Sequence, residues 1–311
     1  MDSQIWLLSD SSETEKDSYR ALDTAFRKQC AGLAVSYRAV LFQDLIMSVE
    51  RGHLKLYLKG WLLSTYPHVV YFRGHTPHLK MDGEVTVLRH LEKMGCRVVN
   101  PLQPMLRCIN KFWTLQELAG HGIPMPDTLS YGGYSDFEEI IELGESKLSY
   151  PLVVKNTRGC QGNAVFLAAD KGHLVGIQHV LRKDSPYLFQ KYIQESHGRD
   201  VRVLVIGGQV VASVKRMAKD GRLQSNLCRG SDTESYTLDE RERYLAVRIS
   251  EILDLDICAI DLLLRKDGSL CVCEVNSNPG FILLERACNV DLASRIAQHI
   301  LSLLPRHRNL Q

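Results

Sequence analysis

The sequence has no strong excess of charge of either sign. Its 38 Lys and Arg residues nearly balance its 36 Asp and Glu residues, which leaves a formal net charge of +2. Domains that bind nucleic acids usually carry a clustered basic excess, and no run of five or more basic residues occurs here. We therefore expect no nucleic-acid partner.

Long apolar runs are also missing. The apolar run nearest the N-terminus, Ile5–Leu8, follows an acidic residue, whereas a signal peptide needs a basic segment and a longer apolar one. No segment approaches the roughly 18–20 apolar residues of a membrane span. The nine cysteines include no CxxC pair, which is typical of a reducing compartment. We expect no membrane association and a cytoplasmic location.

The first hundred residues lack both GxGxxG and GxxxxGK[ST], the usual phosphate-binding motifs. They alternate apolar strand-like runs, at Val35–Phe42 and Val69–Phe72, with helical segments, at Ser18–Cys30 and Glu84–Met94. This alternation predicts a small α/β layer with a partly parallel sheet. From Asn110 onward, hairpin patterns replace the alternation and predict an antiparallel α+β region.

The most informative segment is residues 258–280, CAIDLLLRKDGSLCVCEVNSNPG. Asp267-Gly268 is a strong signal for a two-residue hairpin turn. This turn places Asp261 opposite Glu274, with Asn276 on the same face. Like charges in this position repel each other, so a cation should lie between them, and two carboxylates with an amide oxygen suit Mg²⁺. The alternative is a solvated face with scattered acids, and a three-residue turn with a bulge would shift the register by one.

A second candidate segment spans residues 153–165, where two apolar strands flank a turn that contains two glycines. Glycines let backbone N–H groups approach a phosphate closely. Lys155 ends a buried strand, where an ammonium group is costly unless an anion meets it. The pattern fits a nucleotide-binding turn and also an ordinary hairpin.

Taken in order, these segments resemble the RimK-like amino-acid ligases of the ATP-grasp superfamily. The resemblance covers nearly the whole chain and is carried by VVKNTRGCQG, QKYIQESHGRDVR, KRMAKDGRLQSN, AIDLL and CEVNSNPGF. Within the family, HLEKMGCR, NKFWTLQELAGHG and PDTLSYGG are most similar to the group that makes N-acetylaspartylglutamate and β-citrylglutamate. The resemblance implies an α/β (pre-ATP-grasp) domain at residues 1–100, followed by an ATP-grasp fold with lobes at 101–186 and 187–311.

The activity that this resemblance implies is ATP-dependent ligation. A carboxylate attacks the γ-phosphoryl group of ATP, and the amine of glutamate then displaces phosphate from the acyl phosphate. The expected acid is N-acetylaspartate, with citrate as the second choice, and the expected metal is Mg²⁺ or Mn²⁺, as two ions. Such chemistry depends mainly on positioning and charge neutralisation. The sequence is compatible with an oligomer.

The resemblance also implies the site residues. The nucleotide would be held by Lys111, Lys155, Gln190, Lys191, Tyr192, Ile193, Asp200 and Arg216, with the strand over Tyr187–Ile193 meeting the adenine through its backbone. The catalytic set is Arg202, Arg216 and Asn226, and the metal ligands are Asp261, Glu274 and Asn276. Arg202, Arg216 and Arg229 would line the pocket for the acid, with Arg229 as the candidate specificity residue.

Two segments depart from the pattern of these synthases. The glycine turn reads RGCQGNA where they carry RGHRGKA, and NSNPGF stands in place of NANVGF. The second change and LCRGSDTES are closer to a bacterial relative that adds glutamate to a protein C-terminus, so that activity is an alternative. A non-catalytic nucleotide-binding scaffold is another, against which the metal triad and both lysines argue.

Overall fold

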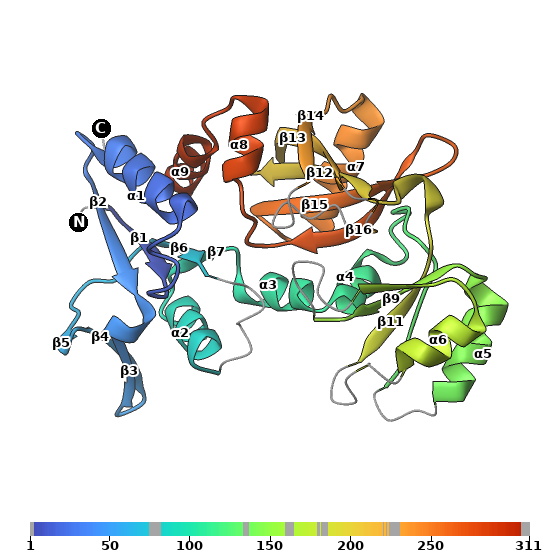
Figure 1. The fold of residues 1–311 in the computed structure, drawn as a ribbon. Coiled ribbons are helices and arrows are strands. Elements are labelled where there is room, and N and C mark those ends of the chain that lie inside the picture. The colour runs from blue at the N-terminus through green and yellow to red at the C-terminus, as the bar shows by residue number, and fades with distance from the viewer. Residues whose placement is uncertain are drawn as a thin grey trace.

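A computed structural model describes residues 3–74, 82–132, 137–158, 165–178, 181, 186–219, 221, 223 and 231–305. Its strands form four sheets, which are arranged as Figure 1 shows. Mixed α/β and α+β organisation, predicted from the sequence, is confirmed.

The first sheet is parallel and has the order β2-β1-β6-β7. Its strands are β1 (Ser3–Ser9), β2 (Val35–Leu41), β6 (Val69–Arg73) and β7 (Arg97–Val99). Alternate side chains of β1 point to opposite faces of the sheet. Ile5 and Leu7 pack with helix α1 (Asp17–Cys30), while Trp6 and Leu8 pack with α2 (Asp82–Lys93).

A second sheet, absent from the sequence-based expectations, contains β3 (Leu45–Glu50), β4 (His53–Leu58) and β5 (Trp61–Leu62). Its β3–β4 turn places Arg51 and Gly52 at φ values of 50° and 80°. Two positive φ values in a two-residue loop make the type I′ turn that suits twisted hairpins.

The third sheet is antiparallel, in the order β10-β9-β11-β8. It contains β8 (Thr128–Ser130), β9 (Leu152–Asn156), β10 (Val165–Ala168) and β11 (Tyr187–Lys191), with helices α5 (Phe137–Leu148) and α6 (Lys171–Gln178). The strand predicted through Ile193 therefore ends earlier, at Lys191. The division of the chain at residue 186 stays a prediction, although β11, beyond that point, pairs with β8 and β9.

The fourth sheet is also antiparallel, with the order β14-β13-β12-β15-β16. Its strands are β12 (Arg199–Ile206), β13 (Gln209–Met217), β14 (Asp232–Ser235), β15 (Ile257–Leu264) and β16 (Leu270–Asn276). The associated helices are α7 (Glu240–Ile252), α8 (Ile282–Cys288) and α9 (Leu292–Ser302). Helices α3 (Leu102–Ile109) and α4 (Lys111–Leu118) connect the first and third sheets.

The first and fourth sheets share one apolar core, in which α9 packs beside α1 (Figure 1). Asn100, which is 2% exposed, fixes this junction. Its amide nitrogen donates to the carbonyls of Ile257, at 2.7 Å, and Ser277, at 2.5 Å, and its amide oxygen accepts from the N–H of Ile257 at 2.9 Å. The first sheet is thereby held against β15 and the end of β16.

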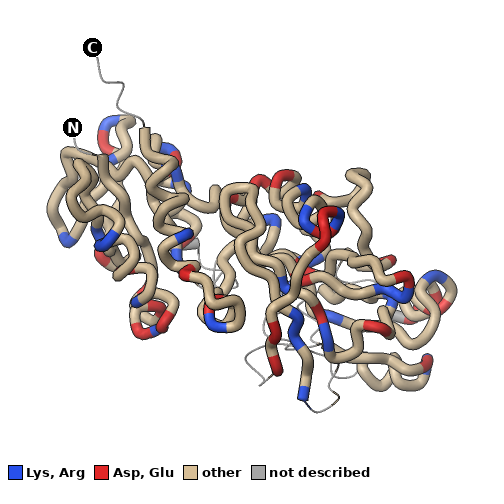
Figure 2. Tube along the Cα trace, turned by 90° about the horizontal axis from the view of Figure 1, so that it is seen from above, with Lys and Arg blue, Asp and Glu red and all other residues tan. Residues whose placement is uncertain are grey.

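Charged positions of both signs are interspersed along the tube in Figure 2. Within the described part of the chain, none of the helices has the length and apolar character required to cross a bilayer.

Candidate active site

Asp261 and Glu274 lie directly opposite each other on β15 and β16, as the sequence predicts. The predicted two-residue turn is wrong. Arg265 donates its N–H to the Ser269 carbonyl at 2.8 Å, so the loop has three residues, Lys266 to Gly268. Such a loop alone would shift the pairing by one residue. A bulge at Cys273, where the register moves from Asp261↔Glu274 to Leu262↔Val272, restores it.

Two arginines lie on the same face as these carboxylates. Arg202 on β12 pairs with Asp261, donating from Nε and Nη2 to the two carboxylate oxygens at 2.7 and 2.8 Å. Arg216 on β13 pairs in the same way with Asp200, and its Nη2 also lies 3.1 Å from Asp261 Oδ2. Arg216 is only 1% exposed. The cation expected beside Asp261 is thus supplied at least in part by the protein itself.

This network shifts the pKa values of the two aspartates in opposite directions. Burial acts to raise the pKa of Asp261, but Arg202 and Arg216 outweigh it, so the pKa lies below its ordinary value. Burial raises the pKa of Asp200, and the neighbouring charge of Asp261 adds to the rise, while Arg216 opposes it. Asp261 therefore carries the more firmly ionised carboxylate of the two.

The predicted lysines reach the same strand from other elements. Lys111, at the start of α4, places Nζ 3.6 Å from Glu274 Oε1. Lys155, on β9, donates from Nζ to Gln190 Oε1 at 2.8 Å and to Cys273 Sγ at 3.4 Å. Gln190 in turn donates to Thr128 Oγ1 at 2.9 Å. Lys155 thus links the third sheet to β16 of the fourth.

The predicted adenine-contacting segment joins these two sheets. Gln190 and Lys191 belong to β11, and the Lys191 N–H is occupied by the Asp127 carbonyl at 2.9 Å. Tyr192 and Ile193 follow the strand rather than extending it, which corrects the predicted end of the strand, while their contact with the adenine stays a prediction. The Ile193 carbonyl accepts from the Ser196 N–H at 3.1 Å, within a 3₁₀ turn that leads into β12.

The donor set suits a hard cation in its chemistry. Asp261, Glu274 and Asn276 offer only oxygen ligands, the kind that Mg²⁺ prefers. Within the described ranges, no three His, Cys, Asp or Glu side chains gather in a way that could hold a metal. The predicted set is different, because its third donor is the amide of Asn276. The predicted metal site therefore stays a prediction.

Several expectations fall outside the described residues. They are Asn226, Arg229 and residues 159–164 of the glycine turn.

The sequence reasoning missed two further residues. Cys273 lies within the predicted hairpin, and its thiol contacts Lys155. Arg73 ends the buried strand β6 and is itself 5% exposed. A basic residue at the end of an apolar strand is the signal that identified Lys155, and it would have found Arg73 as well.

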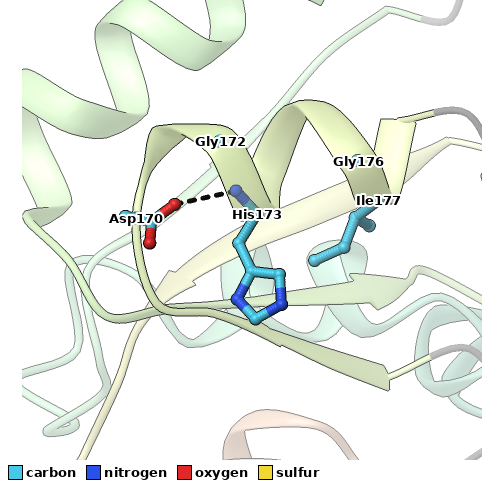
Figure 3. A pocket seen from close by; sticks show the side chains of 5 residues that line it. All are labelled: Asp170, Gly172, His173, Gly176 and Ile177. Atoms are coloured by element: carbon cyan, nitrogen blue, oxygen red, sulfur yellow. Dashed lines mark hydrogen bonds between the residues drawn. The ribbon is translucent and has the colours of Figure 1, made fainter.

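A shallow hollow of about 400 Å³ lies elsewhere, against α6 (Figure 3). It is lined by Asp170, Gly172, His173, Gly176 and Ile177. The hydrogen bond drawn there runs from the His173 N–H to Asp170 Oδ1, at 2.8 Å. Asp170 is thus engaged by the first turn of the helix, and this hollow shares no residue with the charged network.

Comparisons with known proteins show which family the chain resembles. A profile of the RimK-like ATP-grasp domain matches residues 108–300. N-acetylaspartylglutamate synthase A of Homo sapiens is 51% identical over 305 residues, which cover 98% of this chain and 78% of that protein. Beta-citrylglutamate synthase B of Mus musculus is 50% identical over 305 residues, with 98% and 79% covered. The structure of the ATP-grasp ligase PsnB, complexed with a phosphomimetic variant of a minimal precursor, Mg and ADP, has a TM-score of 0.71 at 18% identity, over 97% of this chain and 99% of that one.

Proposed function

The chain belongs to the RimK-like ATP-grasp family, and from this premise we propose that it joins glutamate to N-acetylaspartate, giving N-acetylaspartylglutamate, ADP and phosphate. That it is an ATP-dependent ligase of an acid and an amino acid follows from the family and its close relatives. The identity of the acid and the roles of individual residues are the substance of the proposal.

One observation carries the assignment of the reaction centre to β15 and β16. Six ionisable side chains are linked by ion pairs and by the pairing of Asp261 with Glu274, and a seventh, Lys155, contacts Cys273, the neighbour of Glu274. Four of the seven are basic (Lys111, Lys155, Arg202 and Arg216) and three are acidic (Asp200, Asp261 and Glu274). The excess of positive charge favours a polyanion, and nucleotide phosphates and a dicarboxylate are both polyanions.

The nucleotide would lie between the third and fourth sheets. Lys155 and Lys111 would meet its phosphates, which is supported by their approach to β16 from two different elements. The backbone of Tyr192 and Ile193 would meet the adenine where the chain passes from β11 to β12. Asp200 would lie near the ribose and triphosphate, held in place by Arg216.

Mg²⁺ is the metal that fits, with Asp261, Glu274 and Asn276 as the residues that would hold it. Bound there, it would supply neutralisation of phosphate charge. Arg202 already neutralises Asp261, so this arginine orients the carboxylate. Arg216, shared by Asp200 and Asp261, would balance charge that develops on the transferred phosphoryl group.

These residues provide position and charge rather than a nucleophile. The acid's own carboxylate attacks the γ-phosphorus of ATP, the bond to the β–γ bridging oxygen breaks, and ADP leaves. The amine of glutamate then attacks the acyl carbon, phosphate leaves, and the amine loses one proton. The reaction thus converts ATP to ADP and forms one amide bond for each ATP consumed.

Citrate is the second candidate for the acid, because the beta-citrylglutamate synthase and the N-acetylaspartylglutamate synthase are 50% and 51% identical to this chain. Both acids carry more than one carboxylate, and both suit a cationic pocket lined by arginines such as Arg202 and Arg216.

A partition experiment tests the proposed reaction. The purified protein is incubated with Mg²⁺, ATP and radiolabelled glutamate, either with N-acetylaspartate, with citrate, or with a cell lysate. Label in a small anionic amide, with ADP rather than AMP as the nucleotide product, supports the proposal. Label found only in protein would favour the C-terminal modifier in its place.

A further inference from the structure

Arg73 occupies the position in the first sheet where α/β proteins commonly bind ligands. It is the last residue of β6 and pairs with Ser9, the last residue of β1. From β1 the chain passes to β2 on one side, whereas β6 and β7 lie on the other. Ligands of open parallel sheets bind at the carboxyl ends of the strands where the order reverses in this way.

The guanidinium of Arg73 is held by the loop that follows β16. Its Nη1 donates to Asn278 Oδ1 at 2.5 Å and to the Pro279 carbonyl at 2.8 Å. Asn278 also donates to the Gly74 carbonyl, and the guanidinium carbon lies 5.7 Å from the centroid of the Phe281 ring. All these partners are neutral, so they fix the group without neutralising it.

The opposite edge of the guanidinium is the informative one. Nε of Arg73 is enclosed and has no hydrogen-bond partner, and both bonds to the loop come from Nη1. Arg202 and Arg216 each grip a carboxylate through the Nε and Nη2 edge. Arg73 has no ion pair of this kind within the described part of the chain.

Tyr71 is another polar neighbour of Arg73. Burial raises the pKa of its phenol, and Arg73 beside it opposes the rise. The phenol stays neutral and supplies no counter-charge. A guanidinium that is 5% exposed is costly without an anion, so the arrangement is explained if an anion arrives with a ligand.

The loop that holds Arg73 continues directly from the strand that carries the charged network. Asn278 is two residues beyond Asn276, a separation of roughly 7 Å in extended chain. Ser277, between them, is 4% exposed, and its hydroxyl has no hydrogen-bond partner. A ligand that reacts beside Asn276 is therefore within reach of a second group at this loop.

We propose that Arg73 binds, through its Nε and Nη2 edge, a carboxylate of a substrate that does not itself react. The inference rests on the proposed function for the identity of the substrates. The carboxylate is either the side-chain carboxylate of the acid or the γ-carboxylate of glutamate, and the two sources are separated by experiment.

The test combines an enzyme variant with a substrate that lacks one carboxylate. In the acid arm, N-acetylaspartate is compared with N-acetylalanine, and in the amine arm glutamate is compared with glutamine. For wild-type enzyme, loss of the bound carboxylate should lower kcat/KM at least about tenfold, the range for a hydrogen bond to a charged group. In Arg73→Gln that discrimination should largely disappear in one arm and persist in the other.

Arg97→Gln is the matched control. Arg97 belongs to the same sheet as Arg73, but its side chain is 51% exposed and already forms an ion pair with Asp256, the residue before β15. Its discrimination should equal that of the wild type in both arms. Arg73→Lys, which keeps the charge and loses the fork, should recover only part of the discrimination.

A binding measurement keeps the inference testable if wild-type enzyme turns over neither acid. Calorimetry with succinate, citrate and glutamate, each in the presence of Mg²⁺ and ADP, should show that Arg73→Gln weakens the binding of at least one of them at least about tenfold, whereas Arg97→Gln does not. Failure of turnover alone would overturn the proposed function. The assignment of Arg73 would be overturned if wild type and Arg73→Gln discriminated equally between the paired substrates, or, where turnover fails, if they bound the ligands equally. A parallel loss of kcat/KM for all substrates would also overturn it, because such a loss indicates a structural role.

Discussion

Arg202 and Asp261 lie directly opposite each other on β12 and β15, and the arginine holds both carboxylate oxygens of the aspartate. The hairpin argument from the sequence found only one neighbour of Asp261, namely Glu274. Across the other edge of β15, the sheet supplies a cation that is fixed by the fold. The carboxylate therefore has a defined orientation before any ligand binds.

Replacing Arg202 by Met should destabilise the protein by about 3 kcal/mol, because it leaves a buried carboxylate with one cation fewer. Arg248→Met is the control, since Arg248 pairs with Glu251 at an exposed position, and its loss should cost about 0–1 kcal/mol. Urea unfolding of both variants measures the difference. Similar values for the two variants would contradict a structural role for the Arg202–Asp261 pair.

Glu274→Gln should abolish ligase turnover while changing the free energy of unfolding by less than about 1 kcal/mol. The substitution removes the charge of a proposed metal ligand and keeps its shape. Relief of repulsion from Asp261 is offset because the ion pair between Lys111 and Glu274 is lost, so no large stabilisation is expected. Steady-state assays and urea unfolding measure the two effects, with Glu251→Gln as an exposed control. Wild-type turnover by Glu274→Gln at ordinary Mg²⁺ would refute its assignment.

Lys155→Ala should weaken ATP binding by about tenfold or more, since hydrogen bonds to charged groups contribute about 1.5–3 kcal/mol. Adenosine binding should change little, because adenosine has no phosphates. Lys171→Ala, which removes an exposed lysine paired with Glu145, should affect neither ligand. Isothermal calorimetry measures all three. Equal losses for ATP and adenosine would instead assign Lys155 to the structure of its strand.

Glu84 predicts a pH dependence of stability. Burial raises the pKa of this carboxyl to about 7, and the charge of Asp10 adds to the rise. The folded state therefore binds the Glu84 proton more tightly than the unfolded state does. The stability that this proton contributes is fully present below the pKa of Glu84 in the unfolded chain, and it is lost as the pH rises through about 7. Allowing for solvent screening, Glu84→Gln should be more stable than wild type by about 1–2 kcal/mol at pH 8 and similar to it at pH 4. Unfolding experiments at both pH values would show no such divergence if Glu84 were freely solvated.

The sequence predicted those elements whose periodicity is clean. The helix over Ser18–Cys30 and the hairpin that pairs Asp261 with Glu274 are both confirmed. The β3–β4 hairpin was missed, although its alternating residues flank Arg51-Gly52, because Arg-Gly is a weaker turn signal than Asn-Gly or Asp-Gly. The end of β11 at Lys191 was also missed, since Tyr192 and Ile193 have high strand propensity and tertiary context overrides it.

The site was predicted by type of residue more than by contact. A hairpin gives pairings only between its own two strands, so Asp261↔Glu274 could be inferred, whereas Arg202↔Asp261 joins residues 59 positions apart. The bulge at Cys273 compensates a three-residue turn, and neither feature has a unique sequence signal. Arg73 depends on contacts with residues more than 200 positions away, which only the fold brings together.

Mass spectrometry of the product tests the central claim most directly. The purified protein is supplied with Mg²⁺, ATP, glutamate and an equimolar mixture of N-acetylaspartate and citrate. We expect a product with the mass of N-acetylaspartylglutamate, formed together with ADP and phosphate in equal amounts and missing from reactions with Glu274→Gln. A product with only the mass of β-citrylglutamate would transfer the assignment to the second acid. If neither acid is consumed while glutamate is added to a protein C-terminus, the account of a small-molecule synthase is contradicted.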